Sequence, residues 1–201
     1  MKYFYLYFLF FLFCNAAVFA QSRGAFVEEI ANKHSGFTVR VDVNHPNRVY
    51  AKDELLVATV ESSENGYLYL FYRDAVGNVT MLFPNRFQKR NMVKTNEPVI
   101  IPAPGSIFQI RIDAPFGNEL FKAVVSKKPL EFFADMDLTG INMLPIAEDD
   151  GRELAKSVLA MEQSNWAEHH VGIRTVIAVE SAQSVKRMPK RPFLGRFIFR
   201  R

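Results

Sequence analysis

The chain of 201 residues contains a single cysteine, Cys14. An intrachain disulfide framework is therefore excluded, because no second thiol exists to pair with it. The sequence also lacks a Cys/His zinc spacing, an HExxH helix, a Gly-x-Ser-x-Gly elbow and a glycine-rich phosphate loop. No catalytic, metal or cofactor motif rises above chance, so we expect no cofactor and no catalytic residues recognisable by motif.

Only one apolar run is longer than ten residues, and it opens the chain. Met1-Lys2 is followed by eleven apolar residues up to Phe13, and then by an alanine-rich stretch that ends at Ala20. This pattern predicts a secretory signal peptide over residues 1–20 and a periplasmic or extracellular location for the mature protein. The run is shorter than the roughly 20 residues that a spanning helix needs, and an uncleaved anchor is the alternative. A mature chain without cysteine suits an exported bacterial protein that depends on its core.

Acidic residues are absent from residues 181–201, which hold seven cations and account for the net charge of +4. These candidate binding residues are Lys186, Arg187, Lys190, Arg191, Arg196, Arg200 and Arg201. Such a basic tail predicts contact with an envelope protein, an anionic polymer or lipid head groups. Nucleic acid is not expected, because an exported protein rarely meets it. The alternative is a solvated tail whose apolar residues dock on the domain.

The rest of the chain consists of short apolar or alternating segments separated by Gly, Pro and Asn turns. The segment from Tyr67 to Tyr72 is apolar on both faces, which is typical of a strand in the middle of a packed sheet. Further strands are expected at 37–43, 55–61, 79–83, 98–102, 107–113, 120–125 and 171–179, and helices at 24–33 and 151–163. The spacing predicts a mainly β fold, an antiparallel β-sandwich of about seven to nine strands with one or two short helices.

Three local expectations accompany this fold. Val79, Met81 and Phe83 should point to one face of their strand, because side chains alternate. Gly66 should begin its strand with a positive φ, which glycine adopts without steric cost. The strand at 171–179 should return to the sheet, because an isolated strand would have no partner.

Several short motifs follow one another along the first part of the expected domain. They are Tyr50-x-x-Asp53-Glu54-Leu55, Gly66-Tyr67-Leu68-Tyr69-Leu70, Gly77-Asn78-Val79, Leu82-Phe83-Pro84-Asn85, Pro102, Phe108-x-Ile110 and Ala114-Pro115-x-Gly117. Together, over residues 39–130, they resemble the bacterial domain of unknown function 4384. Trp166-Ala167-Glu168 resembles the segment that often follows that domain. Asp53 stands where the family often has glycine, and aspartate tolerates the same kink.

The resemblance implies no activity, but members of the family often occur in exported or surface proteins. Some are fused to caspase-like peptidases or protein kinases, and this chain resembles a stand-alone version. We expect structural roles rather than ligand contacts for the motif residues. These are Gly66, Tyr67, Tyr69, Gly77, Phe83, Pro84, Asn85, Pro102, Pro115, Gly117 and Trp166. The expected organisation is a signal peptide (1–20), an N-terminal segment (21–36), a β-sandwich domain (37–180) and a basic tail (181–201).

Two groups of side chains deserve consideration as metal ligands. His169 and His170 are neighbours in an expected strand, so they point to opposite faces and cannot chelate one ion together. The acidic segments Asp135-x-Asp137 and Glu148-Asp149-Asp150 are rich in oxygen but lack the EF-hand arrangement. Helix capping explains the second segment more simply, and calcium stays an alternative. We therefore assign no metal ligand.

Taken together, the sequence predicts an exported, non-enzymatic adaptor or binding module of the bacterial envelope. Its partner is expected to be a protein or an anionic polymer. The alternative is a hydrolase of cell-wall or surface polymers that uses scattered carboxylates, whose spacing is set by the fold and not by the sequence.

Overall fold

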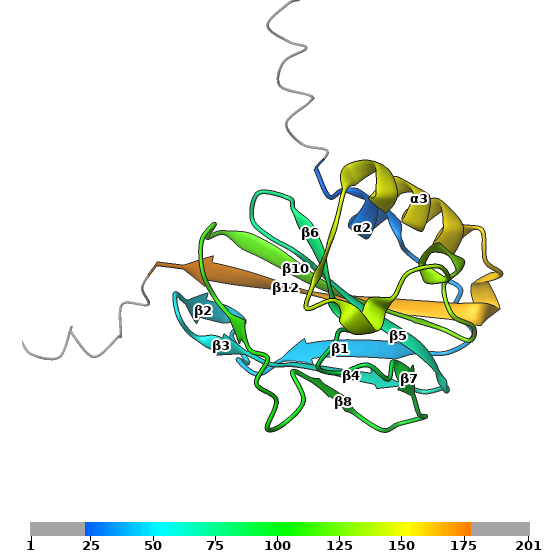
Figure 1. The fold of residues 1–201 in the computed structure, drawn as a ribbon, viewed down its shortest axis with the longest axis horizontal. Helices are drawn as coiled ribbons and strands as arrows, with labels where there is room; N and C mark the ends of the chain where they lie inside the picture. The colour runs from blue at the N-terminus through cyan, green and yellow to red at the C-terminus, as the bar shows by residue number, and fades with distance from the viewer. Residues whose placement is uncertain (1–22, 178–201) are drawn as a thin grey trace, which may run out of the picture.

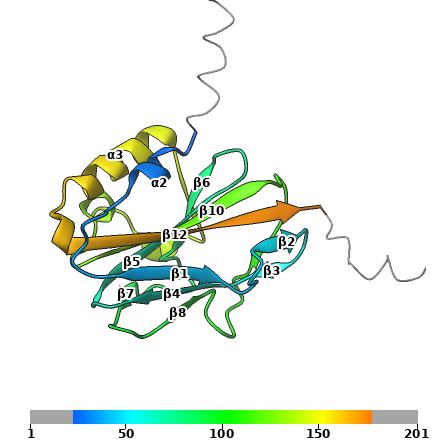
Figure 2. The same cartoon turned by 180° about the vertical axis from the view of Figure 1, so that it is seen from behind.

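The computed structural model describes residues 23–177, which form three layers (Figures 1 and 2). A seven-stranded sheet is the middle layer; a three-stranded sheet covers one of its faces and two helices cover the other. The expected signal peptide and basic tail lie outside the described residues. Among the described residues, no helix has the length and apolar character needed to cross a bilayer.

Two main sheets and one small one hold all the strands of this part of the chain. The three-stranded sheet is antiparallel, in the order β1 (Val39–Val43), β4 (Ala58–Ser62) and β8 (Val99–Ile101). The seven-stranded sheet has the order β11 (Leu144–Ile146), β6 (Val79–Phe83), β5 (Gly66–Arg73), β10 (Asn118–Ser126), β12 (Trp166–Val176) and β2 (Val49–Ala51), with β7 (Met92–Val93) paired to the start of β5. The small sheet pairs β3 (Leu55–Leu56) with β9 (Ile110–Arg111).

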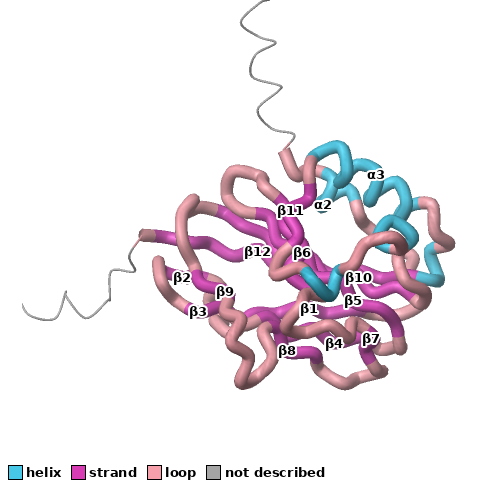
Figure 3. The backbone as a smooth tube through the Cα atoms, in the orientation of Figure 1, coloured by secondary structure: helices cyan, strands magenta, loops and turns pink. Residues whose placement is uncertain are grey.

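The two α-helices lie together on one side of the molecule, as Figure 3 shows in cyan. The α-helices are α2 (Phe26–Glu29) and α3 (Glu148–Leu159). Short 3₁₀ turns are η2 (Glu131–Phe133), η3 (Leu138–Gly140) and η4 (Gln163–Asn165). Gly151 of α3 lies so close to Phe26 of α2 that a Cβ at this position would meet the aromatic ring at 2.2 Å.

The prediction of a mainly β fold is confirmed. The described residues hold twelve strands, of which β3, β7 and β9 are only two residues long, which leaves nine strands of three or more. One pairing is not antiparallel, because β12 and β2 run parallel with Thr175 opposite Tyr50. These two strands are joined by most of the domain and not by a tight turn, so no local connection forces them to be antiparallel.

The middle layer explains why some strands are apolar on both faces. In β5, Leu68 and Leu70 pack toward the three-stranded sheet, and Tyr69 and Phe71 pack toward the helices. Its neighbour β10 buries eight of its nine residues and is hydrogen-bonded to β5 on one side and β12 on the other. The expectation of a central strand at 67–72 is therefore confirmed. We call the two resulting clusters the sheet-side core and the helix-side core.

The prediction that Val79, Met81 and Phe83 of β6 point to one face is wrong for Phe83. The register between β5 and β6 shifts so that Leu82 is an extra residue in β6. Because side chains alternate along a strand, this bulge moves Phe83 to the opposite face from Met81. Val79 and Met81 lie in the helix-side core, whereas Leu82 and Phe83 lie in the sheet-side core.

The expected strand at 55–61 is two strands in different sheets. Between the two strands, both backbone groups of Val57 are hydrogen-bonded to Asn44. The Asn44 N–H donates to the Val57 carbonyl (3.0 Å), and the Val57 N–H donates to Asn44 Oδ1 (2.9 Å). These bonds occupy the groups that a continuous ladder would use. An alternating pattern is the same for one strand and for two consecutive strands, so the break was not visible in the sequence.

The helices and the last strand also differ from their expected bounds. The helix α2 is four residues long, and Ala31 beyond it is exposed. The helix α3 begins at Glu148, where three acidic residues stabilise its first turn. The last strand begins at Trp166, five residues before Val171, and pairs with β10 as a return to the sheet requires.

Gly66 does not have the positive φ that we expected. It is not among the described residues with positive φ. Asp53 is one of them, with a φ of 68°, which agrees with glycine being common at that position in the family. The requirement for glycine is instead a close approach, because a Cβ here would lie 2.7 Å from Val125 Cγ1 and 2.8 Å from the Ser126 carbonyl.

We therefore predict that Gly66→Ala lowers the free energy of unfolding by about 1–3 kcal/mol, because β5 and β10 must separate to admit the methyl group. Urea denaturation measures the effect. Gly172→Ala in β12 is the matched control, since its nearest contact would be an ordinary 3.8 Å. Equal stability of the two variants would contradict the close-approach explanation.

Candidate functional site

A lysine is buried between the seven-stranded sheet and α2. The side chain of Lys122 in β10 is 2% exposed; its Nζ donates a hydrogen bond to the carbonyl of Ile30 and lies 3.3 Å from Glu168 Oε2. Burial lowers the pKa of Lys122, and the Glu168 carboxylate opposes that effect. The pair borders a hollow of about 220 Å³ that Glu28 and His170 also line. A buried lysine of this kind is a type of group found at active sites. Here its bonds tie the end of α2 to the sheet.

A buried carboxyl lies on the opposite face of β10. Glu119 is 3% exposed, and it accepts hydrogen bonds from the Tyr72 hydroxyl (2.8 Å) and from Thr175 Oγ1 (2.7 Å). Burial raises the pKa of Glu119, although both hydrogen bonds favour its charged form. Burial and the neighbouring carboxyl also raise the pKa of Tyr72. The group connects β5, β10 and β12, and both of its oxygens are engaged.

His169 connects the two main sheets. The Val41 N–H of β1 donates to His169 Nδ1 of β12 at 3.2 Å, which closes part of the outer edge of the three-stranded sheet. Accepting this bond requires an unprotonated ring nitrogen. Burial lowers the pKa of His169, and the nearby His170 adds to the effect. The two histidines are consecutive in β12, as expected.

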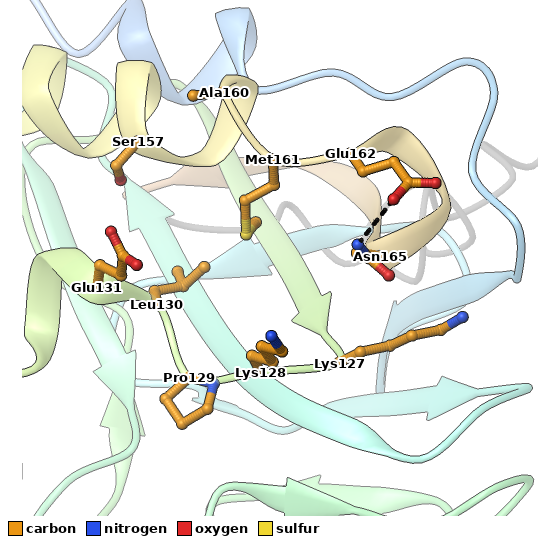
Figure 4. Close-up of a pocket in the computed structure, with 10 residues that line it drawn as sticks. All are labelled: Lys127, Lys128, Pro129, Leu130, Glu131, Ser157, Ala160, Met161, Glu162 and Asn165. Atoms are coloured by element: carbon orange, nitrogen blue, oxygen red, sulfur yellow. Dashed lines mark hydrogen bonds between the residues drawn. The ribbon is translucent and has the colours of Figure 1, made fainter.

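One hollow is formed where β10 leaves the sheet and meets the end of α3 (Figure 4). It has a volume of about 320 Å³, and Pro129, Leu130, Ala160 and Met161 provide its apolar part. Figure 4 shows Met161 projecting toward Leu130, whereas Lys127 extends away from the hollow. Lys128 and Glu131 place opposite charges at its border. This mixed lining favours no single class of ligand.

The acidic segments do not converge on a metal site. Glu148, Asp149 and Asp150 form the first turn of α3, where Glu148 Oε2 accepts the Gly24 N–H at 2.8 Å. Between residues 23 and 177, no group of three or more histidine, cysteine or acidic side chains is arranged to hold a metal ion. The helix capping favoured by the sequence is wrong in its detail: the N-cap is Ala147, no side chain caps it, and the three acidic residues lie inside the first turn, where negative charge is favourable.

A cationic segment follows β6, and we call it the basic loop (residues 86–94). Its cations are Arg86, Lys89, Arg90 and Lys94, and no acidic residue lies among them. Lys94 pairs with Glu97 at 3.5 Å; the other three are exposed and form no ion pair within the described part of the chain. From the sequence we expected electrostatic contacts at the tail alone, although four cations in nine residues without an acid also indicate a charged surface.

Asn85, a motif residue, holds the basic loop. It is fully buried; its Oδ1 accepts the N–H groups of Phe87 and Gln88, both at 2.9 Å, and its Nδ2 donates to the Leu82 carbonyl at 2.6 Å. The Arg86 guanidinium lies 4.7 Å from the centre of the Phe87 ring. The family-like segment therefore positions cations as well as core residues.

Among the motif residues, Phe83 belongs to the sheet-side core, Tyr69 and Trp166 belong to the helix-side core, and Tyr67 packs against the latter. Gly66, Tyr69, Gly77, Phe83, Pro84, Asn85 and Trp166 are buried, and Tyr67, Pro102, Pro115 and Gly117 are half-buried. The seven cations assigned as candidate binding residues, from Lys186 to Arg201, lie outside the described residues.

Replacing Lys122 with methionine should destabilise the protein by about 3 kcal/mol, because the carboxylate of Glu168, whose side chain is 14% exposed, then lacks its cation. The double variant Lys122→Met/Glu168→Gln should recover part of that loss. Chemical denaturation measures both, with exposed Lys128→Met as the control. A double variant no more stable than the single one would show that the ion pair is not the cause.

Because of His169, the free energy of unfolding should decrease as the pH falls below about 6.5, which is the ordinary pKa of histidine and applies to the unfolded chain. Because the folded-state pKa is lower, the unfolded chain takes up the proton first, so acid favours unfolding. His169→Gln, which keeps an acceptor but does not titrate, should flatten this dependence between pH 7.5 and 5.5 in urea denaturation. His170→Gln should keep most of the dependence, because burial and not His170 is the main cause of the shift in the pKa of His169, and a parallel response of the two variants would refute the assignment.

Comparison with known proteins agrees with the motif order. Residues 49–129 match the family described as "Domain of unknown function (DUF4384)", which confirms the resemblance found in the sequence. The match runs from β2 into the residues after β10 and includes Asn85 and the basic loop. No curated protein and no solved structure matched the chain. The chain is therefore similar to the DUF4384 family over residues 49–129.

Proposed function

We propose that this protein is an exported, non-enzymatic adaptor or binding module of the bacterial envelope that holds an anionic partner. The observation that supports this proposal is the basic loop, where Arg86, Lys89 and Arg90 are exposed and unpaired within the described residues. The signal-like start of the chain and its basic tail, both read from the sequence, support export and contact with anions.

The basic loop is held in place before any partner arrives. Asn85 binds two of its backbone N–H groups, and the Arg86 N–H donates to the Ile141 carbonyl at 2.7 Å. The Phe87 ring stacks on Phe108, with centroids 5.6 Å apart. Less conformational freedom is therefore lost when the cations engage an anion, which favours binding.

Cations that lack an intramolecular partner favour a polyanion over a neutral ligand. Their attraction to an anionic surface is strong at low ionic strength and is screened over about 8 Å at physiological salt. Binding through this loop should therefore weaken steeply as salt rises. The exposed, convex position of a loop suits an extended polymer or an acidic protein surface.

The hydrolase alternative would place chemistry on carboxylates. Glu148 is engaged with Gly24 and lies 3.9 Å from Arg152, and both oxygens of Glu119 are hydrogen-bonded. These contacts give both side chains structural roles, so the binding proposal has the better support.

Neutralising the loop should test the proposal. Changing Arg86, Lys89 and Arg90 to serine should weaken binding to inorganic polyphosphate at least tenfold at low salt, because three contacts with the polymer are lost. Isothermal titration calorimetry at two salt concentrations measures the effect. The matched control changes the exposed Lys52, Lys127 and Lys128 to serine, which removes the same charge from other surfaces.

An equal loss in the two triple variants would assign binding to net charge and would remove the loop from the proposal. Turnover of a purified envelope polymer that is lost on replacing Glu148, Asp149 and Asp150 with alanine would support the hydrolase instead.

A further inference from the structure

An isoleucine is exposed at the tip of the loop between β8 and β9. Ile107 is 86% exposed, the largest value among the exposed large hydrophobic residues of the described chain. The residues around it are fixed: the Ser106 N–H donates to the Ala103 carbonyl (3.0 Å), and the Phe108 N–H donates to Ser106 Oγ (3.1 Å). Phe108 itself is 8% exposed. The loop therefore presents one apolar side chain to solvent from an ordered turn.

This tip lies beside the basic loop. Phe108, the residue after Ile107, stacks on Phe87, and the Arg86 guanidinium covers the same Phe87 ring. The Gln88 side chain donates to the carbonyl of Ile100 in β8 at 3.2 Å, which brings a second exposed aliphatic residue to this side.

We call this surface the basic-apolar rim. It consists of Arg86, Lys89, Arg90, Met92, Ile100 and Ile107. Met92, which is 61% exposed, follows Arg90 by two residues at the start of β7. In Figures 1 and 2, β7 and β8 lie on the side of the molecule opposite α2 and α3.

The mixture of side chains favours one class of partner. A soluble polyanion uses the cations but gives no reason for exposed aliphatic residues beside them. Protein interfaces collect their apolar residues in a central buried patch, whereas here the exposed aliphatic residues come singly from separate segments. Cations at the level of head groups together with aliphatic tips that reach the acyl boundary are characteristic of binding to a membrane surface.

We propose that the basic-apolar rim docks the domain on an anionic lipid bilayer. Arg86, Lys89 and Arg90 contact the lipid phosphates, and Ile107 and Met92 enter the boundary between head groups and acyl chains. This inference rests on the proposed function, because the same three cations serve both, and it adds the lipid surface as the partner and Ile107 as the inserted residue.

A fluorescent reporter at the tip tests insertion directly. In the full chain, Ile107→Trp should shift its emission to shorter wavelength on vesicles of phosphatidylglycerol and phosphatidylcholine, and not on phosphatidylcholine alone. Val76→Trp is the matched control, because Val76 is 54% exposed in the turn that lies near Arg23 on the helix side. The native Trp166 is 2% exposed and contributes the same background to both variants.

Affinity supplies the second measurement. Ile107→Ser should weaken sedimentation with the anionic vesicles about tenfold and leave polyphosphate affinity unchanged, whereas Val76→Ser should change neither. Thermal melting confirms that both variants stay folded. No emission shift at position 107, together with unchanged vesicle affinity of Ile107→Ser, would overturn the inference.

The outcomes separate the two proposals. Polyphosphate binding that depends on the basic loop, without vesicle binding, would retain the proposed function and reject the membrane, leaving an acidic protein or a soluble polymer as partner. Loss of loop-dependent binding to both probes would reject both proposals. Vesicle binding that needs the cations but not Ile107 would reject insertion.

Discussion

The burial of β5 and β10 on both faces is the constraint on which the rest of the structure depends. Each strand contributes alternate side chains to the sheet-side core and to the helix-side core, so the two cores share one backbone layer. Each fully buried aromatic or aliphatic side chain contributes roughly 1.5–3 kcal/mol. Separating either outer layer would expose one face of the same strands, which couples the three-stranded sheet and the helices to one another.

Polar groups of this middle layer connect its strands to one another and to the other two layers. Lys122 reaches the end of α2, His169 accepts a backbone N–H from β1, and Glu119 joins three adjacent strands. Buried polar groups are costly when unpaired, so such contacts favour one arrangement of the layers over others that would leave them unsatisfied. Perturbed pKa values therefore mark contacts that hold strands and layers together here, even though such values often mark active sites.

The motif Phe83-Pro84-Asn85 links the core to the surface. Phe83 packs in the sheet-side core, and two residues later Asn85 binds the backbone of the basic loop. A segment that we expected to be purely structural therefore also fixes the position of exposed cations. The stacked rings of Phe87 and Phe108 connect the basic loop to the loop that carries Ile107.

The sequence by itself determined the mainly β class, the central strand at 67–72 and the similarity of residues 49–129 to the DUF4384 family, because these depend on periodicity and on the order of local motifs. It did not determine that Phe83 lies on the opposite face from Met81, or that residues 55–61 divide between two sheets. Those features depend on a bulge and on the side chain of Asn44, which leave the alternating pattern unchanged. Only the tertiary structure brought Ile107 and Ile100 near Arg86, because these residues belong to separate loops and strands. They are brought together by the stacking of Phe87 on Phe108 and by the hydrogen bond from Gln88 to the Ile100 carbonyl.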